Sequence, residues 1–129
     1  MSSERASYLH VSEQDLLTDW GRRLYATFHF AHMPYHVGSS LLHSDWRDVD
    51  VRVMVPTEVY DQIESVLDVR RLNLMMSLWG QKATGLPIDC QVQTIDEGNE
   101  AHGGKRRSAL GIDMDRHRHR HNDWEARRG

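Results

Sequence analysis

The first third of the chain carries apolar residues at helical spacing. Beyond Ser12, steps of three and four positions predict one face of an amphipathic helix, made by Leu16, Leu17, Trp20, Leu24, Phe28 and Ala31. Ser12 and Asp15 stand three residues apart, as in a short-armed capping box, so we expect the helix to begin at Ser12. Because Pro34 disfavours helical backbone in the residue before it, the helix should end by Met33 at the latest.

A short apolar run and then a strict alternation follow this helix. Residues 35–37 predict a short strand that leads into Gly38, and residues 39–43 predict a brief helical turn. From Asp48 to Val55 every second residue is a valine, which predicts a strand with its valine face in the core. The other face of that strand carries Asp48, Asp50, Arg52 and Met54.

The second half of the chain alternates between helical and extended patterns. Residues 57–66 predict a helix that begins after Pro56. The apolar residues 72–79 fit either a buried strand or a helix, since periodicity does not separate the two over so short a run. Residues 88–93 alternate again, with Cys90 on the apolar face and Asp89 on the polar face. The order of these elements predicts an α/β (α+β) fold.

Length and charge divide the chain into two parts. Its 129 residues, 39% of them hydrophobic and 27% charged, suit one globular domain. Residues 1–99 hold 8 Lys/Arg against 14 Asp/Glu, whereas residues 100–129 hold 8 against 5. An acidic body is a poor general binder of nucleic acid. We expect a domain at 1–97 and a basic, Arg/His-rich tail at 98–129 that is extended or partly ordered.

Residues 116–121 of this tail alternate Arg with His. The alternation leaves several roles open: a solvated end, a series of metal-chelating histidines, or a basic arm that touches nucleic acid or an acidic partner.

The sequence also bears on location. No apolar run reaches the length of a membrane span, so we expect no membrane association. The single cysteine, Cys90, excludes an internal disulfide framework, and the polar start of the chain does not resemble a signal peptide. Together these features predict a cytoplasmic protein.

Three aspartates fall on the polar faces of the two alternating strands. Asp48 and Asp50 lie on the same side of one strand, roughly 6.5–7 Å apart at the backbone, and Asp89 lies on the other. Carboxylates placed in this way can converge on a pair of metal ions about 3.5–4 Å apart, the spacing used for in-line nucleotidyl displacement. Hard oxygen ligands favour Mg²⁺, so the pattern predicts a magnesium site.

A Gly-Ser-Ser upstream of the first aspartate supplies a complementary feature. Gly38 permits an unusual backbone angle and the close approach of a ligand. Ser39 and Ser40 bring hydroxyl and backbone N–H groups to the start of a helical turn, where phosphate oxygens bind. His36 and His43 flank the motif and are either acid–base groups or ligands, or histidines that face solvent or the core.

Together these motifs resemble the signature of the DNA polymerase beta-type nucleotidyltransferase superfamily, and the short chain is most similar to its minimal nucleotidyltransferases. The resemblance rests on Gly38-Ser39, the Asp48-Val49-Asp50 motif and a later strand aspartate, Asp89, and it covers about residues 35–94. It implies a small mixed β-sheet flanked by helices. It also implies that Asp48, Asp50 and Asp89 bind two Mg²⁺ ions, while Gly38, Ser39 and Ser40 hold a nucleoside triphosphate.

The activity implied by this resemblance is transfer of a nucleoside monophosphate from the triphosphate to a hydroxyl acceptor, with release of pyrophosphate. The acceptor would be RNA, a protein or a small molecule. Small members of the family work with partner proteins, including as members of toxin–antitoxin pairs. The alternative is a catalytically inactive protein of the same fold that serves as a nucleotide-binding or protein-interaction module.

Arg52 decides between these alternatives, because it lies on the same strand face as the aspartates. An arginine there either contacts a phosphate of the nucleotide or pairs with an acid and weakens the metal site.

Overall fold

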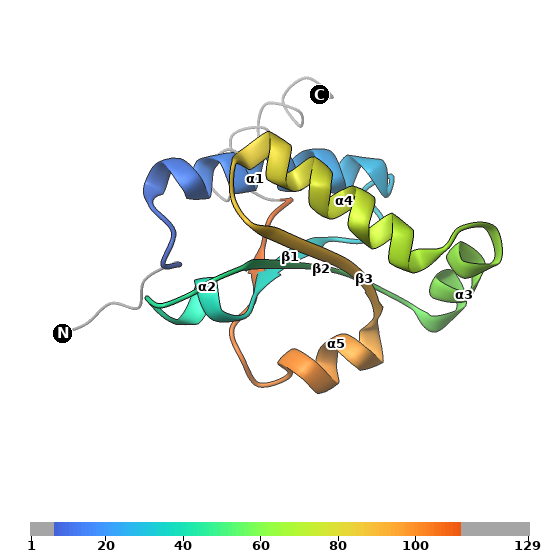
Figure 1. Ribbon diagram of the computed structural model, residues 1–129. Coiled ribbons are helices and arrows are strands. Elements are labelled where there is room, and N and C mark those ends of the chain that lie inside the picture. Colours follow the sequence, from blue (N-terminus) through green and yellow to red (C-terminus); the bar gives the residue numbers. More distant parts are fainter. Residues whose placement is uncertain (1–6, 112–129) are drawn as a thin grey trace, which may run out of the picture.

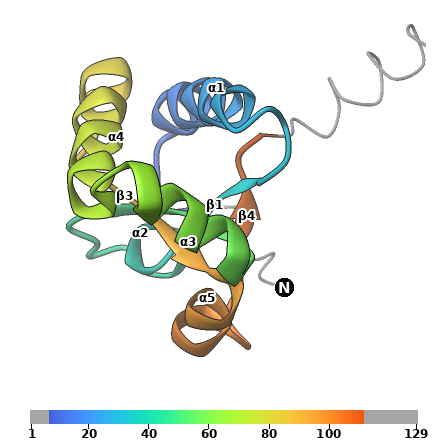
Figure 2. The same ribbon diagram turned by 90° about the vertical axis from the view of Figure 1, so that its right-hand side faces the viewer.

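The computed structural model describes residues 7–111, which form a four-stranded mixed sheet with helices on both of its faces (Figure 1). Helices α1 (Val11–Thr27) and α4 (Val69–Thr84) cover one face, and α5 (Ile95–His102) lies against the other (Figure 2). The short helix α2 (Ser39–Leu42) follows the first strand, and α3 (Thr57–Val66) lies beyond the end of the second. The predicted α/β (α+β) class, with a small mixed sheet flanked by helices, is confirmed.

The strands are arranged in the order β3 (Ile88–Thr94), β2 (Val49–Val55), β1 (Pro34–Val37) and β4 (Ser108–Ala109). β1 runs antiparallel to both of its neighbours, whereas β2 and β3 are parallel and are connected through α3 and α4. The four valines of β2 are fully buried beneath α1 and α4, as their alternation predicts: Val49, Val51, Val53 and Val55. This packing turns the other face of β2 towards α5.

Helix α1 starts and ends differently from the sequence prediction. Its N-terminal cap is His10, whose backbone N–H donates to Oε1 of Glu13 at 2.9 Å, so the expected pair of Ser12 and Asp15 does not form the cap. At the other end, His29 and Phe30 have φ of 57° and 60°, and their N–H groups donate to carbonyl oxygens of the last helical turn. The chain leaves the helix there, and the inclusion of Ala31 in the helical stripe is wrong.

The apolar run at 72–79 belongs to the long helix α4. Asp68 caps its first turn by accepting a hydrogen bond from the N–H of Arg70, and Gly85 ends it with a φ of 72°. From this helix Asn73, Ser77 and Gln81 reach the backbone of β3, the edge strand of the sheet. These side chains satisfy backbone groups that an edge strand would otherwise expose.

The chain beyond residue 97 contributes to the fold as far as Gly111. The predicted boundary at 97 falls inside α5, which is capped by reciprocal bonds between Thr94 and Glu97. Gly98 packs so closely on Met54 that a Cβ there would collide with the Met54 sulfur. β4 then pairs with β1, and Leu110 is buried against α1. Residues 98–110 therefore contain the rest of α5, a connecting segment and the strand β4, and the Arg/His alternation at 116–121 lies outside the described residues.

Within residues 7–111 no helix is both long and apolar enough to cross a membrane.

Candidate functional site

The Gly-Ser turn and the Asp-x-Asp motif meet where β1 ends and β2 begins. Val37 and Asp50 are partners across the antiparallel pair, which places Gly38 directly beside the second aspartate. Gly38 has a φ of 78° and a ψ of −156°, a conformation that is open essentially to glycine alone. A Cβ at this position would also collide with Oδ2 of Asp50. The local sequence therefore brings a backbone without a side chain into contact with a carboxylate.

Asp89 joins Asp50 through the parallel pairing of β3 with β2. The two residues are register partners on neighbouring strands, and both carboxyl groups lie on the face of the sheet away from the valines. The side chain of Asp89 is 44% exposed and that of Asp50 is 23% exposed. Asp48 precedes β2 and is exposed. The aspartates predicted from the sequence thus lie at the starting ends of β2 and β3 and differ in their access to solvent.

Arg52 lies two residues beyond Asp50 on the same face of β2, and it forms ion pairs with Asp50 and Asp89. Its guanidinium is 3.3 Å from Oδ2 of Asp89 and 3.8 Å from Oδ1 of Asp50, and it also donates to the Asp89 carbonyl oxygen at 2.8 Å. The Arg52 side chain is only 10% exposed, and its Nε has no hydrogen-bond partner within the described residues. An arginine this well buried is held by its acid partners and cannot swing out freely.

The charges around Asp50 act in opposite directions. Burial raises the pKa of Asp50 above its ordinary value, Arg52 lowers it, and the neighbouring charges of Asp89 and Asp48 raise it again. Asp48 and Asp89 therefore both lie close enough to Asp50 to affect its protonation. A cation bound beside Asp50 would relieve their mutual repulsion, which Arg52 relieves only in part.

The cluster is not a ready-made metal cage of the expected kind. Across residues 7–111, no three or more His, Cys, Asp or Glu side chains are grouped so that they could hold a metal ion. Two carboxylates, such as those of Asp48 and Asp50, are the number that Mg²⁺ usually takes from a protein when phosphate oxygens and waters supply its other ligands. For Asp89, the contact with Arg52 already occupies Oδ2.

The two serines of the turn have different surroundings. Ser39 is half-buried and begins α2, whereas Ser40 is fully buried. The hydroxyl of Ser40 lies 2.6 Å from Nε2 of His36, so it is directed at that histidine, and only its backbone faces the turn. The sequence shows His36 only as one of two histidines that flank the Gly-Ser-Ser motif. Nothing in the local pattern predicts that its side chain contacts Ser40.

His36 itself is a neutral, buried side chain. Burial lowers its pKa to about 4, and the nearby charge of Arg106 acts in the same direction. Its Nδ1 has no hydrogen-bond partner within the described part of the chain. His36 therefore supports the turn through Ser40, while His43 is exposed on the far side of α2.

Comparison of the sequence with protein-family models, with curated proteins and with solved structures found no match.

Proposed function

We propose that this protein is a metal-dependent nucleotidyltransferase. It would transfer a nucleoside monophosphate from a nucleoside triphosphate to a hydroxyl group of RNA, a protein or a small molecule, with release of pyrophosphate. The observation that carries the proposal is the contact between the bare backbone of Gly38 and the carboxylate of Asp50. A backbone that phosphate oxygens can approach and a carboxylate that can bind a metal ion are thereby adjacent in space.

Each residue of the turn has a role in this proposal. Gly38 lets phosphate oxygens approach the backbone, and Ser39 offers its hydroxyl and an N–H of the first helical turn. Asp50 and the exposed Asp48 offer carboxylate oxygens to Mg²⁺ together with the triphosphate. The metal, when bound, supplies charge neutralisation of the pyrophosphate and a lowered pKa of the attacking hydroxyl.

Arg52 has a positioning role in the proposal. Its bonds to the carbonyl and carboxylate of Asp89 fix β3 against β2, and its charge holds Asp50 and Asp89 side by side despite their repulsion. Because its guanidinium is paired with both acids and its side chain is only 10% exposed, the direct phosphate contact considered from the sequence is not part of the proposal.

A second candidate is a nucleotide-binding or protein-interaction module that transfers nothing. It is favoured by the 3.3 Å contact between Arg52 and Asp89, because that contact takes up the third carboxylate. The transferase and the nucleotide-binding module both bind a nucleoside triphosphate, and only the transferase releases pyrophosphate. A cytoplasmic location is part of the proposal through the single cysteine of the chain. A protein partner such as an antitoxin enters it through the family resemblance alone.

Label transfer separates the two candidates. The full chain is incubated with each α-labelled nucleoside triphosphate, Mg²⁺, and RNA or protein from a cell extract, and both label transfer and pyrophosphate release are measured. The proposal predicts transfer that Asp50→Asn abolishes and that the exposed α3 variant Asp61→Asn leaves unchanged. Nucleotide binding without pyrophosphate release in any arm would contradict the transferase and support the binding module.

Arg52→Lys adds a further arm to this assay. If Arg52 positions the acids, replacing its planar guanidinium by an ammonium group lowers transfer, because a lysine cannot reproduce the bonds to both parts of Asp89. An increase in transfer would instead show that Arg52 silences the site.

A further inference from the structure

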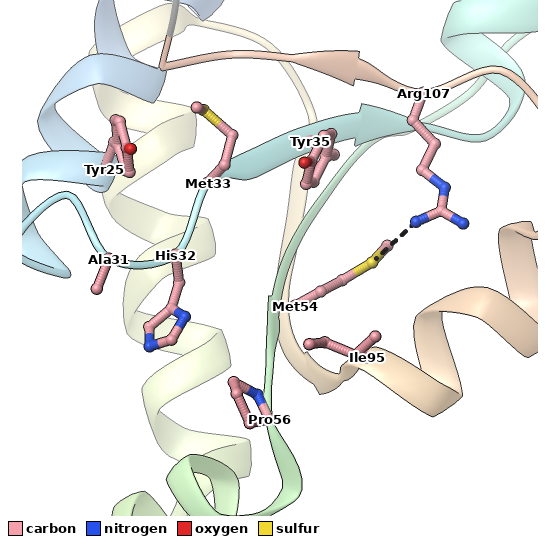
Figure 3. A pocket seen from close by; sticks show the side chains of 9 residues that line it. All are labelled: Tyr25, Ala31, His32, Met33, Tyr35, Met54, Pro56, Ile95 and Arg107. Atoms are coloured by element: carbon pink, nitrogen blue, oxygen red, sulfur yellow. Dashed lines mark hydrogen bonds between the residues drawn. The ribbon is translucent and has the colours of Figure 1, made fainter.

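A second hollow lies at the opposite end of the same sheet face. It has a volume of about 500 Å³ and is formed by α1, the segment before β1, β1 itself, the end of β2, the start of α5 and the approach to β4 (Figure 3). Its lining residues are Tyr25, Ala31, His32, Met33, Tyr35, Met54, Pro56, Ile95 and Arg107. Met54 stands four residues beyond Asp50, about 13 Å along the strand, so this hollow is separate from the Gly38 turn.

The body of the hollow is apolar and aromatic. The side chains of Tyr25, Tyr35, Met33 and Met54 surround it, with Ile95 of α5 at its lower side in the close-up (Figure 3). Tyrosine rings and thioethers adapt well to flat or irregular apolar groups. Its volume lies within the range of roughly 300–1,000 Å³ that small-molecule sites occupy.

The wall of the hollow is also held in place by the fold. Gly111 packs so closely on the Tyr25 ring and the Met33 sulfur that a Cβ there would collide with either. The Tyr25 ring makes an edge-on contact with Phe30, with 5.1 Å between the ring centroids. Tyr35 belongs to the sheet, opposite Arg52. A site whose walls are fixed in this way costs little ordering on binding.

Arg107 gives the hollow its charge. Among residues 7–111 no Asp or Glu lines it, although the chain as a whole carries an excess of acids. The Arg107 guanidinium donates to two neutral acceptors, the Met54 sulfur at 3.3 Å and Oδ1 of Asn99 at 2.9 Å. A thioether is a weak acceptor, and no carboxylate within residues 7–111 forms an ion pair with this arginine.

From this geometry we propose that the hollow is a binding site for a small molecule with an aromatic or apolar body and one anionic group, a carboxylate or a phosphate. The anion pairs with Arg107 and replaces its weak bond to the Met54 sulfur. The body lies between Tyr25, Tyr35 and Ile95. This site is distinct from the one that holds the nucleotide in the proposed function, and it does not depend on that function.

The test uses phenyl phosphate and benzoate as probes, which separate the two anionic groups, and benzyl alcohol and inorganic phosphate as controls. Binding to the full, isotope-labelled chain is followed by NMR titration. We expect at least one of the two probes to shift the resonances of Tyr35, Met54 and Ile95 in preference to those of Gly38 and Ser39. Neither control should produce these shifts at the same concentrations.

Arg107→Gln should weaken this binding about tenfold or more, because it removes a charge-assisted hydrogen bond. Arg71→Gln, at an exposed arginine of α4 on the other face of the sheet, should leave it unchanged. Ile95→Ala is the second variant. Its side chain is 43% exposed, so the change spares the fold while it weakens the contact with the body of the probe.

Several results would overturn the proposal: no shifts with either probe at millimolar concentration, shifts confined to the Gly38 turn, or equal affinity in Arg107→Gln. Asp50→Asn separates this site from the nucleotide site, since it should leave probe binding intact whether or not it abolishes nucleotide transfer.

Discussion

At the scale of single residues, Gly38 is central to the site because the turn contacts the carboxylate of Asp50 there. Its backbone conformation and its contact with Asp50 each exclude a side chain. We expect Gly38→Ala to lower the free energy of unfolding by about 1–3 kcal/mol from backbone strain, with a further loss from the collision with Asp50. Thermal or urea unfolding measures the change, and nucleotide binding should be lost with it.

Gly85→Ala is the matched control for this prediction. Gly85 also has a positive φ, 72°, yet a Cβ there meets nothing within 4 Å. The variant should cost only about 1–2 kcal/mol of left-handed strain and leave nucleotide binding intact. Equal effects of the two substitutions on nucleotide binding would argue against a site at Gly38.

His36 makes a pH-dependent contribution to stability that belongs to the same turn. Its pKa is about 4 in the folded protein, below the ordinary value of 6.5. Between these two pH values the unfolded chain therefore binds a proton at His36 that the folded protein does not bind. This contribution is intact above pH 6.5 and is lost as the pH falls towards 4, by about 3 kcal/mol at most.

Urea unfolding at pH 7.0 and pH 4.5 measures this loss. His36→Gln, which keeps a polar group near Ser40 but does not titrate, should show a smaller loss on acidification than the wild type. His43→Gln, at an exposed position, should lose stability as the wild type does. The same acid sensitivity in His36→Gln and the wild type would show that His36 is not the titrating group.

At the scale of elements, the fold extends through α5 and β4, and Leu110 tests this most simply. Its side chain is 1% exposed and packs where α1 has Gly21. We expect Leu110→Ala to cost about 2–5 kcal/mol of unfolding free energy, measured by urea denaturation. Leu74→Ala, at a leucine that is 58% exposed on α4, should cost much less. A neutral Leu110→Ala would mean that residues 98–110 are not part of the core.

The same elements show what local sequence can and cannot predict. The valine alternation of β2 predicted the strand and its buried face correctly, because the alternation lies entirely within the strand's own residues. The pattern of residues 72–79 alone fits either a strand or a helix. The ends of α4 are set by Asp68 and Gly85, which lie outside that run. α5 and β4 were missed because Gly98 and Leu110 are explained by partners far away in sequence, Met54 and Gly21.

At the scale of the whole molecule, the site follows from how the strands are ordered. The sequence places Asp50, Arg52 and Asp89 on polar strand faces, but only the parallel register of β2 with β3 makes Asp50 and Asp89 neighbours. That register also brings Arg52 into contact with both acids, and the antiparallel pairing of β1 with β2 places the Gly38 turn beside Asp50. The same sheet face carries the second hollow at its other end, and α5 is packed against that face.

Isothermal titration calorimetry of nucleotide binding tests the central claim, that the Gly38 turn and its acids form one Mg²⁺–nucleoside triphosphate site. Mg-ATP and Mg-GTP are titrated into the wild type, into the double variant Asp48→Asn/Asp50→Asn, and into the distant control Asp61→Asn, each with Mg²⁺ and with excess chelator. We predict binding that requires Mg²⁺, that is lost in the double variant and that persists in Asp61→Asn. Binding that survives both the chelator and the loss of Asp48 and Asp50, or no binding of any nucleoside triphosphate to the wild type, would contradict the account.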